Sequence, residues 1–295
     1  MNVKSFLHRR LDVPLTAHVQ RAQAALPQIQ KLNPRVSLHV DTDPILLKDP
    51  AYFAPFSLVI ATDLPHSTVS TVNASCRLSN RPFYAAGTHG FYGFIFADLI
   101  THDFVIEREK SNIPTVLKPE TATRSIIASS TKKSDNGKLV EIVTKRETYS
   151  PIILANSSPV PASLLSSRRR RMQISPLLTC FKALWEFQSI SNTLPSHSHA
   201  DLELFTTLAT EKHRELQLPP ETLHSEFLRS FLQNLGSELV PVTAFLGGQL
   251  AQDVINVLGQ REQPIQNLLL FDGEECKGPV YAMHPIFPPL EGEVV

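Results

Sequence analysis

The segment 241–256 reads P-V-T-A-F-L-G-G-Q-L-A-Q-D-V-I-N, and it constrains the fold more than any other part of the chain. A proline such as Pro241 is tolerated at the first position of a helix, because the N–H that it lacks has no partner there. The neighbouring glycines Gly247 and Gly248 each cost roughly 1 kcal/mol relative to alanine inside a helix. Two such costs imply a compensation, and the usual one is the close approach of another backbone. We therefore predict that this helix packs tightly against the sheet.

Helical and strand-like patterns alternate along the rest of the chain. A short loop leads from the Pro241 helix to an apolar run at 267–272 that is closed by a turn at Gly273. Before them, the periodicity predicts a helix at 17–32, strands at 36–40 and 58–61, a helix at 68–78 and a strand at 82–86. This alternation predicts an α/β fold with a doubly wound, Rossmann-like, mostly parallel sheet.

The pattern changes after residue 90. Two strand-like runs, 91–99 and 102–107, follow each other with no helix between them, so we expect them to pair as an antiparallel extension of the sheet. Apolar residues at helical spacing then return at 177–190, 200–216 and 221–234. These three segments predict a helical insertion ahead of the Pro241 helix.

Composition narrows the classes of function. Lys and Arg total 28, as do Asp and Glu, so the formal net charge is zero and a nucleic-acid-binding role is not indicated. No apolar run approaches the roughly 20 residues of a membrane span, so no membrane association is expected. The three cysteines form neither a metal-like pair nor a disulfide framework.

Four blocks of sequence, in the same order, resemble the adenylation domain of the enzymes that activate ubiquitin and ubiquitin-like modifiers. The blocks are 21–36, 57–76, 87–99 and 241–273. The motif residues that carry the resemblance are Gly87, Gly90, Gly93, Gly247, Gly248, Gln252, Asp272 and Gly273. Within this family the chain is most similar to the smaller, regulatory subunit of the SUMO-activating enzyme, which the Trp185–Phe187 motif and the acidic helix from Asp201 also fit.

The resemblance implies a role as one half of a heterodimer. The partner would be the catalytic subunit, which would bind ATP and Mg²⁺ and carry the reactive cysteine, and SUMO would be contacted only indirectly. No catalytic, cofactor-binding or metal-binding residue is then expected in this chain, and no independent enzymatic activity. The family also implies a nuclear location, to which the exposed-looking block Arg168–Arg171 adds a candidate import signal or, equally, a solvated linker end.

The family resemblance and the hydrophobic pattern together predict that the chain has four regions. Residues 1–107 form the first part of an incomplete Rossmann-like adenylation-type domain, 108–172 a polar linker, 173–236 the helical insertion, and 237–295 the return to the adenylation-type domain. The first glycine is Gly87, so the Gly-rich phosphate turn of the family has no counterpart and its first β-α-β unit is expected to be missing. Leu64 and Pro65 follow Asp63 where nucleotide-binding members carry an Asp-Asn pair.

Reactive side chains are sparse. Cys180 lies in an apolar helical pattern, Cys76 matches a core cysteine of the family, and Cys276 follows two acidic residues, whose charge disfavours a thiolate, so none is expected to act as a nucleophile. His197 and His199 lack the further ligands of a zinc site. His89, between Gly87 and Gly90, fits an interface as readily as a site.

Two alternatives remain open from the residues alone. The chain could be the regulatory subunit for another ubiquitin-like modifier, although the corresponding subunits are usually much longer. It could also be a stand-alone adenylating or dinucleotide-binding enzyme, which would require a Gly-rich phosphate loop.

Overall fold

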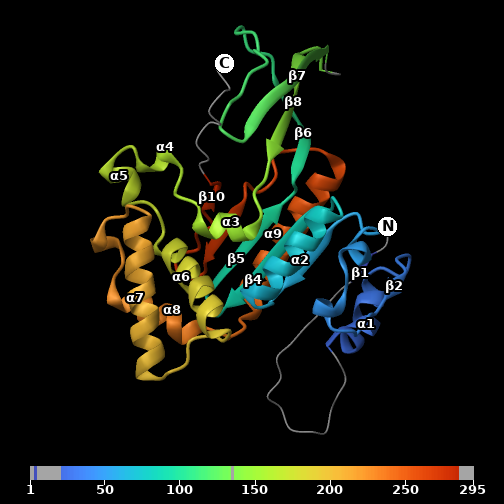
Figure 1. Ribbon diagram of the computed structural model, residues 1–295. Coiled ribbons are helices and arrows are strands. Elements are labelled where there is room, and N and C mark those ends of the chain that lie inside the picture. The colour runs from blue at the N-terminus through green and yellow to red at the C-terminus, as the bar shows by residue number, and fades with distance from the viewer. Residues whose placement is uncertain (1–2, 5–20, 134–135, 286–295) are drawn as a thin grey trace.

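The computed structural model describes residues 3–4, 21–133 and 136–285, and a five-stranded sheet lies at its centre (Figure 1). Its strands run in the order β10-β9-β5-β4-β3. Their bounds are β3 (Val59–Thr62), β4 (Phe83–His89), β5 (Tyr92–Asp98), β9 (Leu268–Asp272) and β10 (Val280–Tyr281). Every residue of β5 is buried, as expected of a central strand covered on both faces.

Most pairs in this sheet are antiparallel, so the predicted mostly parallel sheet is wrong. Among the described strands of the sheet, β3 and β4 pair in parallel, whereas β4–β5, β5–β9 and β9–β10 are antiparallel. The reason is local. Strands β4 and β5 are joined by the two residues Gly90 and Phe91, with Gly90 at φ +58°, and such a short turn can connect only antiparallel neighbours.

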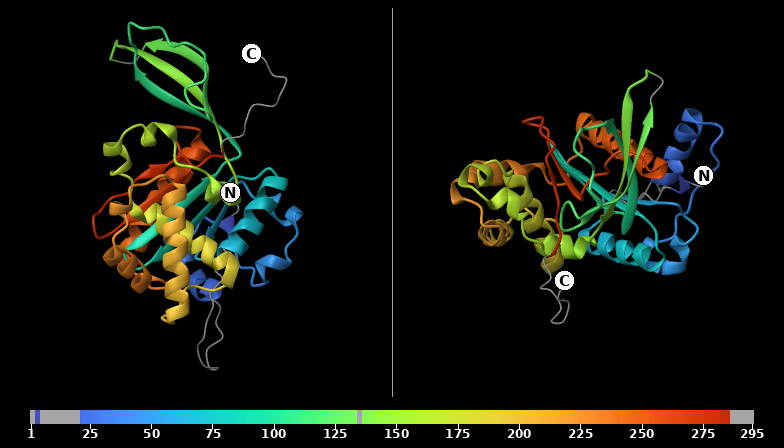
Figure 2. Two further views of the ribbon diagram at one scale, coloured as in Figure 1. Left: turned by 60° about the vertical axis from the view of Figure 1, so that its left-hand side comes forward. Right: turned by 90° about the horizontal axis from the view of Figure 1, so that it is seen from above.

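Helices cover both faces of the sheet (Figure 2). Helices α2 (His66–Leu78) and α6 (Pro176–Ser191) contribute to the core on one face, and α9 (Val240–Gly259) packs on the other. Side chains alternate along each strand, so Ala85, Phe94 and Phe96 face the first core while Tyr84 and Ile95 face the second. The predicted two-sided α/β arrangement is confirmed in this coarse form.

A second sheet of three strands projects from the body (Figure 1). Its order is β6-β8-β7, with β6 (Thr101–Glu109), β7 (Arg124–Lys133) and β8 (Leu139–Thr148), and both pairs are antiparallel. The expected pairing of 91–99 with 102–107 is wrong, because Ile100, at φ +63°, redirects the chain and β6 pairs with β8 instead. The segment 108–172, expected to be a polar linker, is therefore structured.

The remaining elements flank these two sheets. In the insertion, α7 (His199–Glu215) and α8 (Ser225–Asn234) accompany α6, near where their patterns predict them. Near the start, α1 (Arg21–Leu32) agrees with the predicted helix at 17–32, whose first four residues lie outside the described ones. Short elements complete the description: β1 (Val3–Lys4), β2 (Leu38–His39), α3 (Ile152–Ser157), α4 (Ala162–Leu165), α5 (Arg168–Arg171), and 3₁₀ turns at Ile45–Leu47, Pro50–Phe53 and Pro220–Thr222.

Candidate functional site

Helix α9 carries only one charged side chain, Asp253, in twenty residues. That carboxylate faces the sheet, where it accepts hydrogen bonds from the Tyr84 hydroxyl at 2.5 Å and from the Ile265 N–H at 3.0 Å. Burial raises the pKa of Asp253 above its usual value. The inward face of α9 is otherwise apolar, and it consists of Val242, Leu246, Leu250 and Val257. The helix therefore has an ordinary core-facing side.

The opposite side of α9 is equally apolar, yet it is exposed. Residues spaced by three and four positions form one stripe along a helix, and here that stripe contains no polar side chain. We call it the outer stripe of α9, and it consists of Val240, Ala244, Gly247, Gly248, Ala251, Ile255 and Leu258. Val240 is 81% exposed and Ile255 63% exposed. An amphipathic helix would place charged residues on this side, whereas here the side is apolar and none of the residues that the structure describes covers it.

The glycine pair lies in that stripe, and this corrects the prediction of tight packing on the sheet. A Cβ atom built on Gly247 or Gly248 would meet no described atom within 4 Å. No neighbour within the described chain thus compensates for the helix-destabilising effect of these two residues.

None of the helices in the part of the chain that the structure describes has the length and apolarity needed to span a bilayer.

Five further motif residues, Gly87, Gly90, Gly93, Asp272 and Gly273, lie around the turn between β4 and β5 and the adjoining end of β9. A Cβ on Gly87 would lie 2.8 Å from the ring of Phe94, and one on Gly93 would overlap Leu246 of α9. Gly273 donates its N–H to the Phe91 carbonyl at 2.8 Å. The carboxylate of Asp272 accepts from two N–H groups of the turn that follows β9. In the structure these residues make packing and turn contacts.

The cysteines are placed as the sequence predicts. Cys180 and Cys76 are completely buried, and burial raises the pKa of both thiols, to about 12 for Cys76. Cys276 is exposed in the turn after β9, where its sulfur lies 3.7 Å from the Gly273 carbonyl oxygen. No described residue provides a cation beside any of these thiols in a hydrogen bond or ion pair, and such a neighbour is what favours a thiolate.

The structure also places the histidines and the arginine block that the sequence singled out. His199 pairs with Glu203 at 3.7 Å, and the described part of the chain contains no group of side chains that could hold a metal ion. His89 accepts a hydrogen bond from the Gly236 N–H through Nδ1. Burial lowers the pKa of His89 to about 4. The block Arg168–Arg171 forms helix α5, in which the first three arginines are exposed, Arg171 is half-buried and Arg168 pairs with Glu221.

The structure also contains a groove beside α9 that the sequence analysis missed. Gln252, one of the motif residues, lies on its wall and donates to Asn256 at 3.1 Å. Gln266 and His284 form one end of it. The spacing of Gln249, Gln252 and Asn256 along one flank of a helix was a signal for this groove, but Gln266 and His284 come from loops whose path periodicity cannot predict.

Known proteins were compared with the chain as a whole. No model of a known protein family matches it. It is 30% identical over 265 residues to the DNA damage tolerance protein RHC31 of Saccharomyces cerevisiae, which covers 88% of this chain and 74% of that protein. It is 28% identical over 267 residues to SUMO-activating enzyme subunit 1 of Homo sapiens, covering 90% of this chain and 74% of the relative. The Mus musculus subunit 1 matches equally, with 73% of its length covered.

Proposed function

This chain belongs to the family of SUMO-activating enzyme subunit 1, and on that premise we propose that it acts in SUMO activation as the non-catalytic, regulatory half of a heterodimer. The catalytic partner subunit docks on the outer stripe of α9 and binds ATP and Mg²⁺ itself. SUMO is contacted through that partner.

The single observation that carries the proposal is the exposed, uncharged outer stripe. Contiguous apolar surface on a monomer marks a protein interface, and the centre of an interface is depleted of charged residues. The paired glycines supply a flat surface on which a partner backbone can approach closely. Their cost of roughly 1 kcal/mol each is then offset between chains rather than within one.

The non-catalytic part of the proposal draws on the cysteines. A thiol that accepts a modifier requires a setting that favours the thiolate, and Cys76 and Cys180 lie in the core with raised pKa values. We also propose that the purified chain alone supports no SUMO-dependent exchange of pyrophosphate into ATP, because that exchange requires an adenylating site and Leu64 and Pro65 stand where nucleotide-binding members carry an Asp-Asn pair. Exchange above a no-protein control would favour the alternative of a stand-alone adenylating enzyme.

We further propose a nuclear location, with Arg168–Arg171 as the candidate import signal.

Co-purification tests the docking face. The chain is co-expressed with the catalytic subunit of a SUMO-activating enzyme and analysed by size-exclusion chromatography. Ala251→Arg places a charge at the middle of the outer stripe and is expected to abolish co-elution without lowering the melting temperature. Thr206→Arg, on the exposed side of α7, is the matched control and is expected to co-elute like the parent chain. Co-elution of Ala251→Arg at parental affinity would show that α9 is not the docking face.

A further inference from the structure

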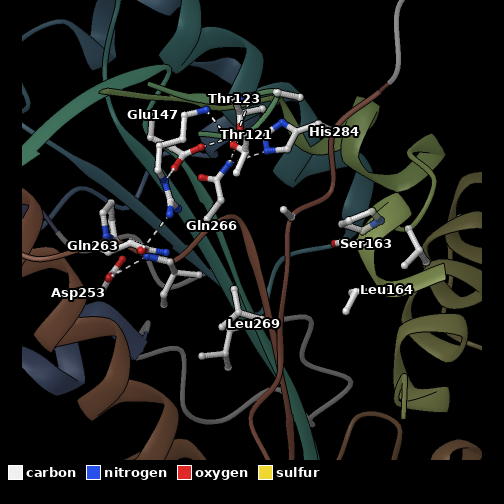
Figure 3. A pocket seen from close by; sticks show the side chains of 18 of the residues that line it. Thr121, Thr123, Glu147, Ser163, Leu164, Asp253, Gln263, Gln266, Leu269 and His284 are labelled. Carbon is white, nitrogen blue, oxygen red and sulfur yellow. Dashed lines mark hydrogen bonds and ion pairs between the residues drawn. The ribbon is translucent and has the colours of Figure 1, made fainter. Parts of the chain in front are cut away.

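A groove of about 1010 Å³ lies along the flank of α9 (Figure 3). Its floor is formed by β9 and the segment 280–284, which contribute Leu269 and the alternating residues Val280 and Ala282 to the lining. Helix α9 forms one wall, and the segment around α4, with Ser163 and Leu164, forms the other. The groove is therefore large enough for a short stretch of polypeptide and has the apolar floor typical of binding sites.

Five of the residues that line the groove carry a side-chain amide. Gln249, Gln252 and Asn256 come from α9, and Gln263 and Gln266 from the loop that precedes β9. A carboxamide, like a peptide group, offers N–H donors and a carbonyl acceptor and carries no charge. Amides that line an apolar groove therefore match a polypeptide main chain.

The charged residues of the lining are already paired. Arg124 donates to Glu147 at 2.5 Å through Nε and to Gln263 at 3.1 Å through a terminal nitrogen. Asp253 is held by Tyr84 and by the Ile265 N–H. A phosphate or a charged side chain entering the groove would find no free counter-charge among the lining residues. The occupant that fits this groove is therefore uncharged.

Gln266, at the polar end of the groove, leaves one buried side-chain oxygen without a hydrogen bond from any described residue. It is more than nine-tenths buried, and its Nε2 donates to His284 Nε2 at 2.6 Å. His284 consequently carries its proton on Nδ1 and donates it to the Ser150 hydroxyl at 3.0 Å. Gln266 Oε1 has no partner within the described chain. Turning the amide over would leave a buried donor instead, so one end lacks a partner in either orientation.

We propose that this groove binds an extended, uncharged segment of the partner subunit, with peptide groups of that segment hydrogen-bonding to the exposed amide of Gln252 and the half-buried amide of Asn256. This inference rests on the proposed function, since the groove and the outer stripe share helix α9. A partner seated on Ala251 and Ile255 needs to extend only across the helix to reach Gln252 and Asn256. Apolar side chains of the segment then cover Leu269 and Leu164, while its peptide groups meet the amides.

Site-specific photo-crosslinking in the co-purified heterodimer tests the occupant. p-Benzoylphenylalanine replaces Val280, which lines the groove and is 45% exposed, and in a control preparation it replaces Thr206 of α7. The Val280 position is expected to crosslink to one stretch of the partner, identified by mass spectrometry, and the Thr206 position is not. A crosslink to a second copy of this chain, to its own residues 286–295 or to no polypeptide would overturn the proposal.

Affinity measurements separate this inference from the proposed function. Val280→Glu brings an unpaired charge into the groove and is expected to weaken the heterodimer about tenfold, whereas Val280→Thr, of nearly equal shape, changes the affinity less than twofold. Ala251→Arg removes the heterodimer altogether. A heterodimer that forms through α9 but ignores Val280→Glu and gives no crosslink overturns the groove alone. Failure of the two parent chains to associate at any concentration overturns both.

Discussion

Helices α6 and α9 look alike in sequence, but the fold covers them very differently. Both begin with a proline in the first turn and both are predominantly apolar. In α6 ten of sixteen residues are buried, whereas in α9 five of twenty are. α6 is enclosed by the sheet, α2 and the insertion helices, while α9 contacts the sheet with one side only. The buried α6 stabilises the chain itself, whereas the exposed side of α9 is the face that we propose for a second molecule.

The sharpest test of this contrast truncates one apolar side chain on each helix. Phe181 of α6 is completely buried and its ring packs against Phe94 and Phe231 at centroid distances of 5.3 and 5.4 Å. Phe181→Ala should lower the free energy of unfolding by about 3–5 kcal/mol, because it leaves a cavity. Ile255→Ala on the outer stripe should change it by less than about 0.5 kcal/mol. Urea unfolding of the isolated chain measures both, and equal losses would break the comparison.

The second test is the pH dependence of stability, because α6 packs against a buried histidine, His66. His66 of α2 stacks on Trp185 of α6 at 5.4 Å, and burial lowers the pKa of His66 to about 4 from 6.5. Below pH 6.5 the unfolded chain binds a proton that the folded chain does not, so stability falls as the pH drops towards 4. The loss from this residue approaches about 3 kcal/mol. It is absent at neutral pH.

The matched variant for this pH effect is His66→Phe, which keeps a ring against Trp185 and cannot titrate. We expect its free energy of unfolding to fall less steeply between pH 6.5 and 4 than that of the parent chain. Half-buried His89 and His284, whose pKa values are also lowered to about 4, add to the slope in both proteins, so the difference reports His66. Parallel pH profiles for the two proteins would contradict the buried, neutral state of His66.

Sequence patterns anticipated these helices well because side-chain burial within one helix is periodic. The extents of α2, α6 and α9 follow from apolar spacing, from Pro176 and Pro241 at the helix starts, and from local turn chemistry. The pairing of β6 with β8 could not be predicted in the same way. This pairing depends on the positive φ of one residue, Ile100, and on a partner strand that lies about forty residues further along the sequence.

The candidate site shows the same limit. Sequence alone identified Gly247 and Gly248 as unusual, since two adjacent helical glycines are costly in any context. It then placed their compensating neighbour within the chain, whereas the structure leaves both facing outward. Local sequence identifies residues that are unfavourable in a helix. Tertiary packing decides which side of the helix is buried, and local sequence does not contain that information.

Gly248→Leu distinguishes inner from outer packing directly. If Gly248 contacted the sheet, leucine there would cost about 1–3 kcal/mol through overpacking. With open space beyond its Cβ, we expect the isolated chain to melt at or above the parent temperature, since leucine is a better helix former. The affinity for the catalytic subunit should instead fall at least tenfold, which is about 1.4 kcal/mol. Thermal melts and titration calorimetry separate the two, and a destabilised variant with intact affinity would reverse our reading of α9.

The smallest expected effect comes from adding one methyl group at each of two glycines. Gly248→Ala should raise the stability of the isolated chain by about 1 kcal/mol, because alanine restricts the unfolded backbone and its Cβ meets nothing. Gly93→Ala should lower it, since that Cβ would overlap Leu246 and lie 3.0 Å from the Gly87 carbonyl oxygen. Leu246 belongs to the covered side of α9, so the two variants probe opposite sides of one helix. Chemical unfolding resolves the signs, and destabilisation by both variants would mean that the outer stripe is packed against the chain after all.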